Sequence, residues 1–109
     1  MAYKHTVYIP QHDNDHSESS YVLAPTIKST LVEAFVVNFG GATVTEGYGY
    51  YKMSDGFTAE DKVWLVQTIC DVPSIDGILA FHIANIKNVL KQESVLYTVE
   101  NYANVIFVS

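Results

Sequence analysis

Residues 40–51 read Gly-Gly-Ala-Thr-Val-Thr-Glu-Gly-Tyr-Gly-Tyr-Tyr, and they mark the place where a helix gives way to a strand. The leading glycine pair is typical of a left-handed helix cap. Glycine inside a strand costs stability and often marks a bulge or a close approach by another backbone or a ligand. Tyrosine adds a flat apolar face and a hydroxyl that needs a partner. The stretch therefore predicts a strand that forms the wall of a site.

The chain before this stretch predicts a strand, a loop and a helix. Residues 4–10 form a short β-type run that Pro10 ends, and residues 11–20 are polar without periodicity, as in a loop. Pro25 suits the first turn of a helix. Helical spacing then puts one set of residues on the buried side of that helix: Ile27, Leu31, Ala34, Phe35 and Asn38.

The chain after this stretch predicts three more elements. Strands over residues 42–53 and 60–70 are separated by residues 54–59, where Asp55-Gly56 is a strong hairpin signal. Pro73-Ser74 opens a second helix, with Ser74 as its cap. The buried side of this helix holds Ile75, Ile78, Leu79, His82, Ile83, Ile86 and Leu90.

A last strand begins near Ser94 and carries Val95, Leu96, Tyr97 and Val99. Residues 104–108 either continue it or form a separate edge strand. The order βαββαβ predicts an α+β, ferredoxin-like fold, an antiparallel sheet with two helices on one face. We expect a single domain over residues 1–109.

Composition excludes several classes of function. The net charge of −6 and the six scattered basic residues argue against nucleic acid as a partner. A single cysteine, Cys70, rules out an internal disulfide and fits a reducing compartment. We find neither a run of about 20 apolar residues nor a signal peptide. We therefore expect a cytoplasmic protein without a membrane partner.

The predicted topology brings three loops to one end of the sheet: residues 12–20, 52–60 and 91–94. Together they would place acidic residues, one lysine and two histidines on a common rim. Its charged members are Asp13, Asp15, Asp55, Glu60, Lys91 and Glu93. This rim is where we expect a site.

The third predicted strand does not alternate between apolar and polar residues, as a sheet covered on one side should. One parity reads Val63, Leu65, Gln67 and Ile69, and the other reads Trp64, Val66, Thr68 and Cys70. Both faces are therefore largely apolar. A second copy of the chain is the simplest cover for the open face, so we expect a homo-oligomer.

The cluster His12, Asp13, Asp15 and His16 has side chains that ligate metals. Its spacing matches no closed metal motif, and Asp in a polar loop usually bonds its own backbone. We therefore expect a solvated loop, with neither a metal nor a cofactor. His82 lies on an apolar helical stripe and is expected in the core, and Cys70 is expected to be a small buried side chain.

Glu46, Tyr48 and Tyr50 share one face of their strand, and Tyr51 points to the other. These tyrosines either pack against aromatic residues, Trp64 and Tyr97, or form a stacking platform for a flat ligand. Glu60 either binds a ligand amine, acts as a base where desolvated, or is a solvated charge beside a turn.

Several segments together resemble the phage S-adenosylmethionine lyases, small trimeric proteins of PII-like, ferredoxin-like fold with sites between subunits. The segments are Val7-Tyr8-Ile9-Pro10, Asp13-Asn14-Asp15, Phe39-Gly40-Gly41-Ala42-Thr43, Gly47-Tyr48-Gly49-Tyr50, Asp55-Gly56 and Glu60. The resemblance implies cleavage of S-adenosylmethionine to methylthioadenosine and homoserine lactone, in a homotrimer and in the host cytoplasm if a phage encodes the chain. It implies catalytic roles for Glu60 and Tyr50, with Glu60 on the substrate amine.

The resemblance further implies substrate contacts from Glu46, Tyr48, Tyr51, Asp13 and Asp15. The acidic and aromatic side chains suit a cationic sulfonium. Two other classes remain open. One is a PII-like module that binds a nucleotide or metabolite without catalysis, and the other is an acidic phage protein that binds a host protein.

Overall fold

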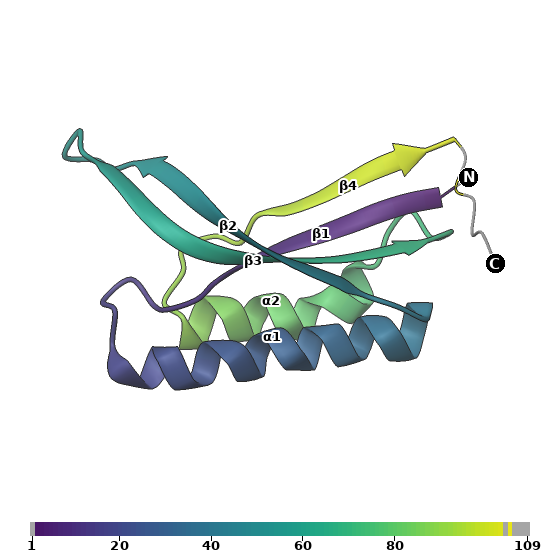
Figure 1. The fold of residues 1–109 in the computed structure, drawn as a ribbon, viewed down its shortest axis with the longest axis horizontal. Coiled ribbons are helices and arrows are strands. Elements are labelled where there is room, and N and C mark those ends of the chain that lie inside the picture. Colours follow the sequence, from purple (N-terminus) through teal and green to yellow (C-terminus); the bar gives the residue numbers. More distant parts are fainter. Residues whose placement is uncertain (1, 104, 106–109) are drawn as a thin grey trace.

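The computed structural model describes residues 2–103 and 105, and it confirms the predicted βαββαβ order (Figure 1). The elements are β1 (Ala2–Pro10), α1 (Glu18–Phe39), β2 (Thr43–Lys52), β3 (Thr58–Cys70), α2 (Asp76–Val89) and β4 (Tyr97–Tyr102). The sheet has the order β2-β3-β1-β4, and each neighbouring pair is antiparallel. Both helices lie on the same face of the sheet. The fold is ferredoxin-like α+β, as predicted.

Helix α1 begins at Glu18, so the prediction of a loop through residue 20 and a start near Pro25 is wrong. The Ser17 side chain caps the helix, because its Oγ accepts a hydrogen bond from the backbone N–H of Ser20 at 3.3 Å. Pro25 lies inside the helix on its exposed side, where the backbone hydrogen bond it removes faces solvent. A polar segment without apolar periodicity can therefore begin a helix when a cap is present.

The core forms between the helices and one face of β1 and β3, and it contains most of the predicted positions. Asn38 is an exception, since it is exposed and its amide donates to the carbonyl oxygen of Ala34 at 2.8 Å. The members of the buried apolar cluster are Val7, Ile9, Ala24, Ile27, Leu31, Phe35, Trp64, Val66, Ile75, Leu79, Ile86 and Leu90. His82 is buried beside them, as predicted.

The ends of the later elements differ from the prediction in two places. Helix α2 has Ile75 at its N-cap without a capping side-chain bond, so Ser74 is not the cap. Strand β4 begins at Tyr97, later than the predicted start near Ser94, although the N–H of Tyr8 still donates to the Leu96 carbonyl just before it at 3.0 Å. The predicted strand over residues 104–108 falls almost wholly outside the described residues.

The β2–β3 hairpin extends past the helices and curves away from them (Figure 1). Gly40 caps α1 with a φ of +87°, and Gly56 turns the hairpin with a φ of +89°, so both glycines occupy left-handed conformations, as their positions predicted. Because no helix covers the outer part of the hairpin, Tyr48, Tyr50 and Tyr51 are all exposed.

The open face of the sheet is only partly covered within one chain. Val63 is buried at the hairpin end, whereas Ile69 is 41% exposed at the other. Helix α1 is by length and composition apolar enough to cross a membrane, but Leu31 and Phe35 on its inner side are buried against the sheet. The outer side of the helix is apolar too, since Val22 and Val37 are 72% and 75% exposed, so packing against the sheet accounts for only part of that composition.

Candidate functional site

A groove with a volume of about 830 Å³ lies between the β2–β3 hairpin and residues 92–96, with the end of β1 beside it. Tyr51, Lys52, Glu60 and Asp61 reach it from the hairpin. The loop after β1 and the segment after α2 also line it, with His16 on the first and Glu93 on the second. We call this space the hairpin groove. It confirms that the three predicted loops meet at one end of the sheet.

The Tyr51 ring lies directly over Gly49, two residues earlier on the same face of β2. A Cβ atom at Gly49 would lie 2.7 Å from two ring carbons of Tyr51, closer than real Cβ contacts come. At Gly47 the nearest atom would be a Leu65 methyl at 3.4 Å, an ordinary contact. The close approach that the strand glycines predicted is therefore made at Gly49 by the chain's own tyrosine, whose ring forms part of the groove wall.

The hairpin groove is acidic. Glu60, Asp61 and Glu93 line it with carboxylates, against one lysine, Lys52. Lys62, the other hairpin lysine, pairs instead with Glu46 at 3.7 Å. A space lined by more carboxylates than cations favours a cationic ligand.

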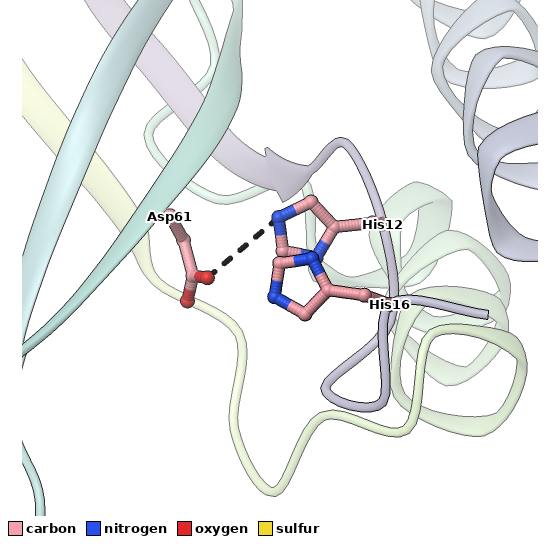
Figure 2. A group of neighbouring side chains, drawn as sticks. All are labelled: His12, His16 and Asp61. Atoms are coloured by element: carbon pink, nitrogen blue, oxygen red, sulfur yellow. Dashed lines mark ion pairs between the residues drawn. The ribbon is translucent and has the colours of Figure 1, made fainter.

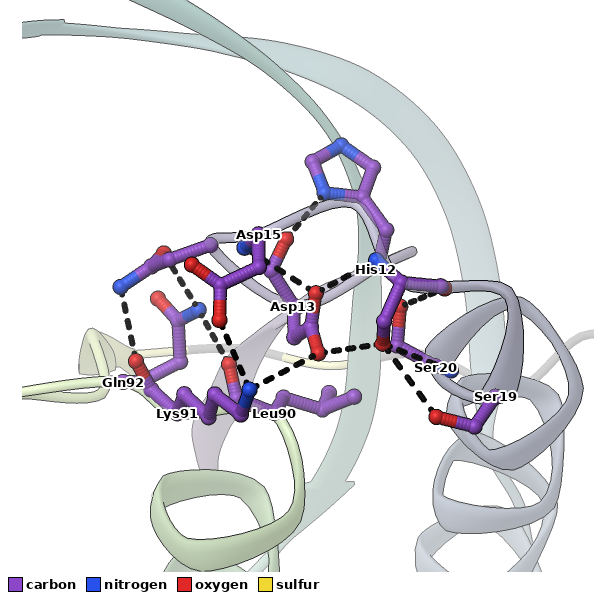
Figure 3. Close-up of polar contacts among 10 residues, drawn as sticks. His12, Asp13, Asp15, Ser19, Ser20, Leu90, Lys91 and Gln92 are labelled. Carbon is purple, nitrogen blue, oxygen red and sulfur yellow. Dashed lines mark hydrogen bonds and ion pairs between the residues drawn. The ribbon is translucent and has the colours of Figure 1, made fainter.

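Asp13 organises the loop beside the groove (Figure 3). Its carboxylate accepts the Ser17 hydroxyl at 2.5 Å and the backbone N–H groups of Ser17 and Asp15 at 2.9 and 3.1 Å. The hydrogen bonds from Ser17, together with the Lys91 ammonium, hold the pKa of Asp13 below its usual range despite its burial. Asp13 therefore shapes the loop through the local bonds that were expected of it, but the expectation of a solvated loop is wrong for His12 and Asp13, which are both buried.

Lys91 joins this loop to the segment after α2. Its ammonium donates to Asp15 at 2.7 Å, and this bond and charge raise the pKa of Lys91 above its usual range. The Asn14 amide donates to the Lys91 carbonyl oxygen at 2.7 Å, and Gln92 donates to Asn14 at 3.0 Å. The carboxylates of Asp13 and Asp15 are thus both engaged, and neither lines the groove.

The strand pairing places Glu46, Tyr48, Tyr50 and Glu60 on one face of the hairpin and Tyr51 on the other. Tyr50 is directly opposite Glu60 in the strand pairing, and Tyr48 is opposite Lys62. Glu46 is opposite Trp64 and also accepts from the Gln11 amide at 3.2 Å. Only Glu60 and Tyr51 among the predicted residues line the hairpin groove, while Glu46, Tyr48 and Tyr50 do not.

The predicted packing of the β2 tyrosines against Tyr97 is wrong, since β2 and β4 form opposite edges of the sheet. Tyr97 stacks instead on His5, with ring centroids 5.9 Å apart. Trp64 is buried in the core, with the Lys28 ammonium 4.8 Å from its ring centroid.

Asp61 is the residue that the sequence analysis missed. It lies on β3, and one of its oxygens is 3.7 Å from Nε2 of His12 (Figure 2). The His12 and His16 rings stack with centroids 3.7 Å apart. The spacing of Asp61 after the hairpin turn offered one signal, since antiparallel pairing returns that position to the loop end of the sheet.

No protein-family model and no curated protein matches this sequence. Among the solved structures that match this chain, two share its fold as follows. One is a phage SAM lyase in complex with S-methyl-5'-thioadenosine, with a TM-score of 0.61 and 15% identity over 91% of this chain and 80% of that chain. The other is the divalent cation tolerance protein (Cut A1) from Thermus thermophilus, with a TM-score of 0.56 and 16% identity over 97% of this chain and 88% of that chain.

Proposed function

We propose that this chain is an S-adenosylmethionine lyase and that the hairpin groove holds the substrate. The observation that carries the proposal is the groove itself, an acidic space of about 830 Å³ with the Tyr51 ring in its wall. Its carboxylates suit the sulfonium and the ammonium of the substrate, and an aromatic face attracts such cations. The shared fold with a phage SAM lyase supports the same reaction.

The reaction needs no external nucleophile. The substrate carboxylate attacks the carbon next to the sulfonium, a C–O bond forms, and the C–S bond breaks with its electron pair moving to sulfur. The products are homoserine lactone and neutral methylthioadenosine. The negative charge of the carboxylate and the positive charge of the sulfonium both disappear in this step. A partly dry pocket that holds the substrate in its curled conformation would therefore speed the reaction.

In this proposal Glu60 binds the substrate ammonium and Tyr51 contacts the sulfonium or the adenine. Both line the hairpin groove. Glu46, Tyr48 and Tyr50 lie outside it, so they would contact substrate only where a second copy of the chain completes a pocket over the hairpin. The proposal therefore includes a homotrimer in which the active sites lie between subunits. The exposure of all three hairpin tyrosines supports it.

The test is incubation of the purified protein with S-adenosylmethionine, followed by chromatographic detection of methylthioadenosine and homoserine products. We expect turnover by the natural protein. Glu60→Gln and Tyr51→Leu, which removes the aromatic ring, should each lower the rate by about ten-fold or more, as expected for loss of a group that positions the substrate. The matched controls are Glu33→Gln on α1 and Tyr102→Leu on β4, both remote from the groove, and these should retain the activity.

Absence of methylthioadenosine at high protein concentration would refute the lyase proposal. Calorimetric titration with methylthioadenosine then separates the remaining classes. Binding without turnover would indicate a metabolite-binding module, which the ferredoxin-like fold also accommodates. Absence of both would favour an acidic protein with a protein partner.

A further inference from the structure

We propose that His12, His16 and Asp61 form a binding site for a divalent transition-metal cation such as Zn²⁺. The site lies at the edge of the hairpin groove, because His16 and Asp61 are also groove residues (Figure 2). The proposal does not depend on lyase activity. It rests on the arrangement of three side chains from two segments that are far apart in the sequence.

The three side chains present their ligand atoms to a common space. One nitrogen of each histidine and one oxygen of Asp61 all lie within 4.8 Å of one another. The Asp61 oxygen is 3.7 Å from Nε2 of His12. A tetrahedral Zn²⁺ with ligands at about 2.0–2.1 Å holds neighbouring ligand atoms roughly 3.3 Å apart. His12 and Asp61 are therefore nearly at that separation already.

The hydrogen bonds of His12 leave its Nε2 lone pair directed at a carboxylate. Its Nδ1 lies 2.8 Å from the backbone oxygen of Asp13, which accepts only, so Nδ1 carries the proton. In neutral His12, Nε2 is then an acceptor facing the Asp61 oxygen. Two acceptors so placed repel each other unless a cation lies between them. A metal-ligating histidine is usually held in this way, with its other nitrogen bonded to a backbone carbonyl.

His16 has a similar partner. Its Nδ1 is 3.1 Å from the hydroxyl oxygen of Tyr21, which can accept a hydrogen bond from the Nδ1–H and leave Nε2 available as a ligand. The His16 side chain is exposed, whereas His12 is buried. His16 can therefore rotate out of its stack on His12 and move closer to the cation, while His12 and Asp61 stay in place.

The loop itself brings the two histidines together. The backbone N–H of His16 donates to the carbonyl oxygen of Asp13 at 3.1 Å, which closes a turn, and His16 takes a left-handed conformation with a φ of +52°. The Asp13 carboxylate holds the same turn through Asp15 and Ser17. In this proposal the carboxylate ligand comes from Asp61 and not from Asp13. Asp13 instead shapes the loop that presents the two histidines.

Two imidazoles and one carboxylate are the donor set of several zinc and iron sites with an open position. Here the open position would face the hairpin groove, where a water or a ligand oxygen has room. The competing account is a plain ion pair, in which a proton on Nε2 of His12 balances Asp61. A metal titration separates the two accounts.

The experiment is titration of the chelator-treated protein with Zn²⁺ by calorimetry, and with Co²⁺ by visible absorption. We expect saturable binding of one ion per chain and the intense visible bands of a low-coordinate Co²⁺ site. Histidine ring signals in NMR spectra should shift for His12 and His16 but not for His5 or His82. His16→Ala and Asp61→Asn should each weaken Zn²⁺ binding by about ten-fold or more.

Asp15→Asn is the matched control, since it removes a carboxylate from the same loop outside the ligand set. It should bind Zn²⁺ like the natural protein. Circular dichroism checks that each variant is folded; His16 is exposed, so its replacement spares the core. Absence of saturable binding, or equal affinity in the His16→Ala variant, would overturn the proposal and leave the ion pair as the role of the cluster. No step uses S-adenosylmethionine, so failure of the lyase assay leaves this test unaffected.

Discussion

The Tyr97 hydroxyl donates a hydrogen bond to Nδ1 of His5 at 2.5 Å and so joins residues that are 92 positions apart in the chain. His5 is fully buried on the helix-facing side of β1, and its Nε2 donates to the backbone oxygen of Val72 at 2.8 Å. Because Nε2 carries the proton, Nδ1 has to accept. The pair therefore ties β4 and the segment before α2 to the central strand.

We expect Tyr97→Phe to lower the free energy of unfolding by about 1–3 kcal/mol, because Nδ1 of His5 would be left buried without a donor. The measurement is urea denaturation followed by circular dichroism. Tyr102→Phe is the control, since the Tyr102 hydroxyl bonds only an exposed carboxylate, Glu100, at 3.1 Å and its loss should be nearly neutral. Equal stability of the two variants would show that His5 finds another donor.

Gly49→Ala should change the position of the Tyr51 ring with little effect on stability. A new Cβ meets the far end of the Tyr51 ring, which can swing away because the side chain is exposed, and alanine offsets part of the cost by restricting the unfolded chain. NMR signals of the Tyr51 ring should shift, and binding of methylthioadenosine should weaken. Gly47→Ala introduces only an ordinary contact and should do neither. If the NMR signals of the Tyr51 ring did not shift in the Gly49→Ala variant, the position of this ring in the wall of the hairpin groove would be contradicted.

His82 should make the protein less stable on mild acidification. Desolvation by burial lowers the pKa of His82 below its ordinary value, so the unfolded chain binds the proton more readily than the folded one. Its contribution to stability is then complete above about pH 6.5 and is lost as the pH falls below that value. His82→Leu keeps an apolar side chain and should flatten this part of the profile, as measured by urea midpoints from pH 7.5 to pH 5, about the range in which histidine titrates. If the urea midpoint of the His82→Leu variant fell with pH as steeply as that of the natural protein, a group other than His82 would be responsible for the pH dependence.

The exposed hairpin tyrosines should determine the oligomeric state. We expect light scattering to give a mass above the 12.1 kDa of one chain. Replacing Tyr48 and Tyr50 together by glutamate should shift the mass toward the monomer, because charges would enter an apolar contact. Val37→Glu, on the outer side of α1, is the control and should keep the natural mass. A monomeric natural protein would refute the expectation drawn from the two apolar faces of β3.

Local chemistry accounts for the parts that could be predicted. The glycine cap at Gly40, the Asp55-Gly56 turn and the apolar spacing of both helices follow from backbone conformation and periodicity within a few residues. Their order was enough to predict the ferredoxin-like fold. The start of α1 was missed because its cap depends on Ser17, within a loop whose bonds to Asp13 leave no periodic signal.

The sequence by itself determined the element order, the acidic balance and the meeting of the three loops, since strand direction in an antiparallel sheet follows from connectivity. Only the tertiary structure decided which residues of that rim face one another. Asp61 reaches His12 through the strand register and the curvature of the hairpin, whereas Asp13 turns back to Ser17 and Lys91. Register and curvature depend on packing over the whole sheet. The contacts between side chains that are distant in the sequence therefore cannot be predicted from the local spacing of residues.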